Sequence, residues 1–165
     1  KMTKQVSTHA LAARAIRKEL KSNKIDASVT SQVFSGGTSI EILMYDYPPD
    51  TVALVEQIVK KYQRGHFSHM SDMYENSNSR VDIPQVTYTN VTNKFSSDMW
   101  QRAYRYMLKN TFVSDSQYLP SPENACSSNT SGTWIRVGDD TGYACTLVHR
   151  ILHGNLLSFW STLNA

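Results

Sequence analysis

Two stretches of alternating polar and apolar residues, joined by a short turn, constrain the fold of this chain more than any other feature. In residues 26–34 and again in residues 38–45, the apolar side chains fall on one side of the alternation, which is the period of a half-buried strand. Ser35-Gly36-Gly37 supplies the positive-φ residues that a tight turn between them needs. The sequence therefore predicts a β-hairpin whose apolar side other elements must cover.

The first of these elements is a helix that precedes the hairpin. Ser7 is a suitable N-cap, and Ala13, Ile16 and Leu20 then recur at helical spacing. Neighbouring alanines favour the helical conformation, and the pattern ends near Asn23. We expect this helix to pack on the hairpin through its apolar side.

A second helix is expected after the hairpin. Pro48 and Pro49 end the preceding strand, and Asp50 or Thr51 can cap the helix. Its apolar residues form one inward ridge, which consists of Val52, Val55, Ile58, Val59 and Tyr62.

The middle of the chain predicts shorter elements. Residues 64–83 are polar and irregular, which indicates a long surface excursion with a short turn near residues 70–74. Residues 85–92 favour a third strand, after which Ser96 or Ser97 can cap another helix. The ridge of that helix consists of Trp100, Tyr104, Met107 and Leu108.

The last third of the chain predicts one strand and one helix. Residues 114–132 are typical of a long connection, and a short strand is expected at residues 133–137. The final helix is expected to begin near Asp140 or Thr141, with a break at Gly154. The predicted order is α-β-β-α-β-α-β-α.

This order predicts an α+β fold in two layers, with helices packed on a small, mostly antiparallel sheet. A length of 165 residues suits a single domain over residues 1–165, in which residues 114–165 form a C-terminal extension. Hydrophobic residues make up 40% of the chain, so it has enough apolar surface to fold.

Composition also limits the cellular setting and the partners. No apolar run approaches the roughly 20 residues of a membrane span, and no secretory signal begins the chain. Cys126 and Cys145 match no metal or redox motif, so we expect reduced thiols in a cytoplasmic setting, with one disulfide between them as the alternative. The net charge of +3 permits a nucleic acid or an acidic protein as partner. Nothing in the sequence indicates a cofactor or a small-molecule ligand.

The strongest candidate for a binding surface is the exposed side of the first helix. Arg14, Lys18 and Lys21 are spaced i, i+4 and i+7, and Arg17 and Lys24 lie beside them. Such clustered cations suit phosphate groups, and binding through them weakens with salt. The alternative is an ordinary solvated helix face.

A second basic group, Lys60, Lys61 and Arg64, ends the second helix. It could add to an anion-binding surface. The alternative is that these cations only stabilise the helix macrodipole.

Two histidine pairs have the residue types of a metal site. His66, His69, Asp72 and Glu75 are ligand types for zinc or iron, but their spacing is generic, so a metal-dependent enzyme is the weaker hypothesis. His149 and His153 lie four apart in the final helix, where a zinc protease would need a glutamate after the first histidine. Arg150 stands at that position. We therefore expect no catalytic site.

Several segments together resemble a known family, the large polyvalent protein-associated domain number 29. They are the helix at residues 13–20, the hairpin VFSGGTSI at 33–40, and the segments VEQIVKKYQRGHF at 55–67 and MSDMYE at 70–75. The resemblance covers residues 7–110. Ser68 and His69 depart from the aspartate and glycine usual in the family, so it assigns no site to this loop.

The resemblance implies an origin in a bacteriophage or a conjugative element. Small proteins of such elements commonly act in counter-defence, for example by binding a CRISPR or restriction complex of the host. The leading hypothesis is therefore a non-catalytic interaction protein of this kind. The alternative is a nucleic-acid-binding module that uses the first helix.

Overall fold

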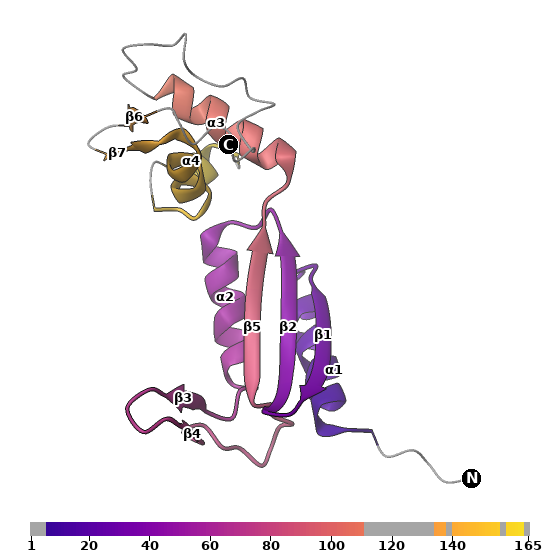
Figure 1. The fold of residues 1–165 in the computed structure, drawn as a ribbon. Coiled ribbons are helices and arrows are strands. Elements are labelled where there is room, and N and C mark those ends of the chain that lie inside the picture. The colour runs from indigo at the N-terminus through magenta and orange to yellow at the C-terminus, as the bar shows by residue number, and fades with distance from the viewer. Residues whose placement is uncertain (1–5, 111–133, 138–139, 156–157, 164–165) are drawn as a thin grey trace. The chain divides into compact units, whose positions relative to one another are not determined.

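The computed structural model describes residues 6–110, 134–137, 140–155 and 158–163 (Figure 1). The chain separates into two compact units, residues 1–94 and 95–165, and each is described by itself. That the whole chain is one domain stays a prediction.

A three-stranded sheet forms the centre of the first unit. β1 (Ser28–Phe34) and β2 (Gly37–Tyr45) are the predicted hairpin, paired antiparallel from Ser28↔Leu43 to Phe34↔Gly37. β5 (Tyr88–Lys94) pairs with the other side of β2, and this pairing is parallel. The sheet is therefore mixed rather than mostly antiparallel, because the crossover between β2 and β5 returns the chain in the same direction.

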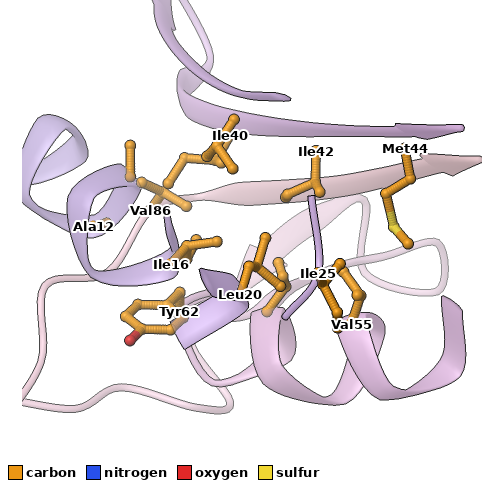
Figure 2. Close-up of a cluster of buried hydrophobic side chains, with 13 residues drawn as sticks. Ala12, Ile16, Leu20, Ile25, Ile40, Ile42, Met44, Val55, Tyr62 and Val86 are labelled. Atoms are coloured by element: carbon orange, nitrogen blue, oxygen red, sulfur yellow. The ribbon is translucent and has the colours of Figure 1, made fainter. Parts of the chain in front are cut away.

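Two helices cover one face of this sheet. α1 (Thr8–Ser22) and α2 (Pro49–Lys60) have the predicted positions, and Ser7 is the N-cap of α1. α2 starts earlier than predicted, with Pro48 at its N-cap, because proline at the first helical position has a suitable φ and needs no N–H partner. The buried side chains between these layers include Ala12, Ile16, Leu20, Ile40, Ile42, Met44, Val55, Val59, Tyr62 and Val86 (Figure 2).

The segment after α2 contains a small hairpin where the sequence predicted an irregular excursion. β3 (His66–Ser68) and β4 (Met73–Glu75) pair antiparallel, with Asp72 at a φ of 53° in the turn. These strands are too short to show a period in the sequence. Gly65 precedes β3 at a point where the two strands come close, since a Cβ atom there would lie 1.8 Å from the Glu75 carbonyl oxygen.

We predict that Gly65→Ala destabilises the first unit by about 2 kcal/mol, because the methyl group collides with backbone rather than with a movable side chain. Urea unfolding of the full chain measures this change. Gly142→Ala is the control, since its Cβ would lie at an ordinary 3.5 Å from Leu147. Equal stability of the two variants would contradict the close approach at Gly65.

In the second unit, α3 (Ser97–Lys109) begins where the sequence predicted. The Ser96 hydroxyl accepts a hydrogen bond from the Met99 amide as its N-cap. The buried residues of this unit are Ala103, Tyr104, Met107, Ala144, Leu147, Val148, Ile151, Leu152 and Phe159.

The end of the chain differs from the prediction in one element. β6 (Trp134–Val137) confirms the expected strand, but β7 (Asp140–Tyr143) pairs with it where a helix start was predicted. That pairing uses residues 140–143, so the helix α4 (Ala144–Leu152) starts only after Tyr143. A second short helix, α5 (Phe159–Leu163), follows.

Gly154 has a φ of 74° just beyond α4, which confirms the predicted break. The predicted connection at residues 114–132 lies outside the described residues.

The α+β class is confirmed, with helices packed on a small sheet in the first unit. In the part of the chain that the structure describes, no helix is both long and apolar enough to cross a membrane.

Candidate binding surface

The two sides of α1 have opposite chemistry. Ala12, Ile16 and Leu20 are buried against the sheet, and Arg14 and Lys18 on the other side are exposed. The exposed residues of α1 and its C-terminal turn also include Arg17, Lys21 and Lys24. The five predicted cations therefore all reach the surface, because the helix can satisfy its apolar side only by turning them outward.

Four of these cations are available to a partner. Arg14, Lys18, Lys21 and Lys24 form no ion pair with any other described residue. Arg17 differs, because its guanidinium donates a hydrogen bond to the Val29 carbonyl oxygen of β1. Arg17 thus contributes charge to the surface while it holds α1 on the hairpin.

The packing of α1 against α2 gives the members of the second basic group, Lys60, Lys61 and Arg64, different surroundings. Lys61 Nζ lies 2.6 Å from Glu19 Oε2, so its charge is offset within the protein. The hydroxyl group of the neighbouring Tyr62 donates to the other oxygen of Glu19. Lys60 and Arg64 are exposed and form no ion pair with the residues that the structure describes. Of this group, Lys60 and Arg64 therefore present charge that no described residue offsets, and a role of the group in binding stays a prediction.

Glu19 is the charged link between the two helices. Burial raises the pKa of its carboxyl group, but the hydrogen bonds from Lys61 and Tyr62 and the charge of Lys61 together outweigh burial, so the pKa lies below its ordinary value. Burial and the bond to Glu19 raise the pKa of Tyr62. The contact is therefore made by an ionised carboxylate and a neutral phenol.

We predict that Glu19→Gln lowers the free energy of unfolding by about 1 kcal/mol at neutral pH. Because the folded pKa of Glu19 is lowered, its contribution is present above the ordinary pKa of 4.5 and is lost as the pH falls through the folded value. The variant should therefore lose less stability on acidification than the wild type. Glu56→Gln, at an exposed position of α2, is the control for chemical denaturation between pH 7 and about pH 3.

A groove of about 890 Å³ lies beside the end of α2 and β5. Its lining comes from α2, from the chain around β3 and from the residues of β5 at 89–91. The Gln63 side chain links two segments of the lining. Its oxygen accepts from the Thr89 amide at 3.0 Å, and its nitrogen donates to the Gly65 carbonyl oxygen at 2.7 Å. Asn78, another lining residue, donates to the Gln63 carbonyl oxygen at 2.9 Å.

The loop proposed as a weak metal site does not gather its candidate ligands. His66 Nε2 lies 4.0 Å from Glu75 Oε2, and His66 Nδ1 is 3.0 Å from the Ser77 hydroxyl. His69 and Asp72 are exposed in the turn between β3 and β4. Among the described residues, no three histidine, cysteine or acidic side chains could share a metal ion.

His149 in α4 and His153, the C-cap of that helix, do lie together, with their ring centroids 4.2 Å apart. Phe95 contacts His153 edge-on, and Trp100 lies 6.3 Å from His149. Burial lowers the pKa of His153, and the nearby His149 lowers it further. His153 is therefore favoured in its neutral form. Cys145 is a free thiol, and Cys126 lies outside the described residues.

We predict that the stability of the chain decreases as the pH falls below 6.5, the ordinary pKa of histidine, toward the lowered pKa of His153. The unfolded chain takes up a proton at His153 before the folded chain does, so acid favours unfolding. His153→Gln should remove the part of this decline that comes from His153. His149→Gln should make the decline smaller, because it removes the neighbour that lowers the pKa of His153 further. Parallel stability curves for the wild type and His153→Gln between pH 8 and pH 5 would refute the prediction.

These features define a small α+β protein with an exposed basic helix and a polar groove. The chain belongs to the large polyvalent protein associated domain 29 family, whose family model matches residues 7–104. The resemblance noted from the sequence is thereby confirmed, and it places the chain among domains of phage and mobile-element proteins. No curated protein and no solved structure matches the chain.

The sequence did not indicate the groove. Gln63, Asn78 and Thr89 belong to three separate segments, and each is an ordinary polar residue in its own segment. The only local signal was Gly65, which allows β3 and β4 to approach closely enough for these side chains to meet.

Proposed function

We propose that this chain is a non-catalytic interaction protein of a bacteriophage or a conjugative element, and that it acts in the host cytoplasm. Its target in this proposal is a host defence complex, such as a CRISPR or restriction complex, which it inhibits by binding. Family membership supports the mobile-element origin. The role in counter-defence goes beyond that membership and rests on analogy with other small proteins of such elements.

The observation that carries the proposal is the outward row of cations on α1. Arg14, Lys18 and Lys21 lie on one exposed helix face, opposite the side chains that hold α1 on the sheet. No described acidic residue pairs with them. A row of unpaired, exposed cations favours an anionic patch on a partner and speeds the encounter with it.

We predict that a triple variant, Arg14→Ala with Lys18→Ala and Lys21→Ala, captures its host target at least about tenfold less efficiently, mainly through a slower association. The measurement is a pull-down from host lysate with the full chain, followed by mass spectrometry. A defence complex should be the dominant protein captured by the wild type.

The matched control removes the same charge elsewhere, with Lys94→Ala, Arg105→Ala and Lys109→Ala at exposed positions. Both triple variants should unfold at similar denaturant concentrations. The proposal fails if no defence complex is captured. Equal capture by the two triple variants would show that α1 is not the contact surface.

The same cations favour nucleic acid as a second candidate partner, through Arg14, Arg17, Lys18, Lys21 and Lys24. In that case the chain should retain labelled DNA or RNA, and the triple variant of α1 should lower the slope of log K against log salt by about 2 to 3. Retention that does not depend on salt, or that the variant leaves unchanged, would exclude this use of α1.

A further inference from the structure

β5 forms one edge of the sheet in the first unit, and β1 forms the other. The Asp46 amide donates to the Lys94 carbonyl oxygen at 2.9 Å, which continues the parallel pairing of β2 with β5. Backbone groups alternate in direction along a strand, so Thr89 and Val91 direct their N–H and C=O groups away from β2. The bond from the Thr89 amide to the Gln63 side chain agrees with this direction.

The side-chain amide of Gln63 stands where a peptide group of a further strand would lie. Its oxygen accepts from both the amide and the hydroxyl group of Thr89, at 3.0 and 2.7 Å. Gln63 thus satisfies one backbone donor at the start of the edge. The Val91 amide is the next outward donor along β5, and it has no partner outside the sheet among the described residues.

The groove runs along this edge. Its lining includes Glu56, Gln57 and Lys60 of α2, and Thr89, Asn90 and Val91 of β5. Its volume of about 890 Å³ lies within the range of ligand sites, and its amide and hydroxyl groups suit a backbone more than an apolar ligand.

The charged residues of the lining indicate which kind of peptide the groove would bind. Lys60 is exposed and forms no ion pair with the described residues, whereas His66 Nε2 lies 4.0 Å from Glu75 Oε2. The acidic side chain in the lining is Glu56. The positive charge of Lys61 is offset by Glu19, which is not a lining residue. Lys60, in the last turn of α2, therefore offers a positive charge that complements an acidic residue.

We propose that this groove binds an extended, acidic peptide segment of a partner protein, which adds to the outer edge of β5 as a further strand. The inference rests on the proposed function in so far as the partner is a protein. Main-chain bonds to Val91 would supply affinity, and an acidic side chain near Lys60 would set the register. Gln63 keeps its bond to Thr89 and marks the end of the added strand.

The test is a selection of displayed random peptides on the purified full chain, followed by binding measurements with synthetic copies of the enriched peptides. We expect enriched peptides to carry acidic residues among β-branched ones. Lys60→Glu should weaken their binding about tenfold or more, whereas Lys94→Glu, the same change at an exposed position outside the groove, should not.

Hydrogen exchange identifies the backbone contact without any substitution. Peptide binding should slow exchange at the Val91 amide, and the Ile42 amide, which faces β5 inside the sheet, is the reference. The proposal is overturned if no acidic peptide is enriched, or if bound peptide leaves the Val91 amide unchanged. Protection of Val91 by single-stranded DNA instead of peptide would also overturn it.

The two proposals can fail separately. If a defence complex is captured, and Lys60→Glu captures it as well as the wild type does, the groove is not the contact but the proposed function stands. If peptides bind at β5 while no defence complex is captured, the groove stands and the counter-defence role does not.

Discussion

Burial of one side of α1 against the β1–β2 hairpin is the constraint on which the first unit depends. Ala12, Ile16 and Leu20 occupy the contact with the apolar side of β2, at Ile40 and Ile42. Burial of a large aliphatic side chain stabilises a fold by roughly 1.5 to 3 kcal/mol, so this face fixes the rotation of the helix. That rotation sends the cations outward and places Glu19 on the side of α2.

The groove depends on the same packing through a chain of polar contacts. Glu19 holds Lys61 and Tyr62 at the end of α2, and the next residue, Gln63, reaches the edge of β5. The Tyr62 carbonyl also accepts from the Val86 amide at 2.8 Å, just before β5 begins. The outward direction of the α1 cations and the position of the groove therefore both follow from the packing of α1 and α2.

The sequence predicted the parts of the fold that repeat a period over many residues. The alternation in β1 and β2 and the apolar ridges of α1 and α2 indicated those elements correctly. Burial was predicted wrongly in the second half of β1, where Val33 is exposed because it lies beyond the part of the strand that α1 covers. β3, β4 and β7 were missed or misread because their three or four residues show no clear alternation of polar and apolar side chains. The parallel pairing of β5 was missed because strand direction depends on the crossover rather than on local sequence.

For the candidate surface, the sequence identified all five cations of α1, since helical spacing fixes which side chains share a face. It could not show that Glu19 offsets Lys61, because that contact joins residues 42 apart. The groove could not be predicted from the sequence either, because its hydrogen bonds link Gln63 to Thr89 and Asn78 to Gln63 across separate segments.

Lysine reactivity tests the central claim, that α1 presents its cations to a partner, most directly. The full chain would be acylated alone and in complex with the host target that it captures, and each lysine would be quantified by mass spectrometry. The account predicts that Lys18 and Lys21 become protected in the complex while Lys94 and Lys109 keep their reactivity. Unchanged reactivity of Lys18 and Lys21 in a complex that remains bound would contradict it.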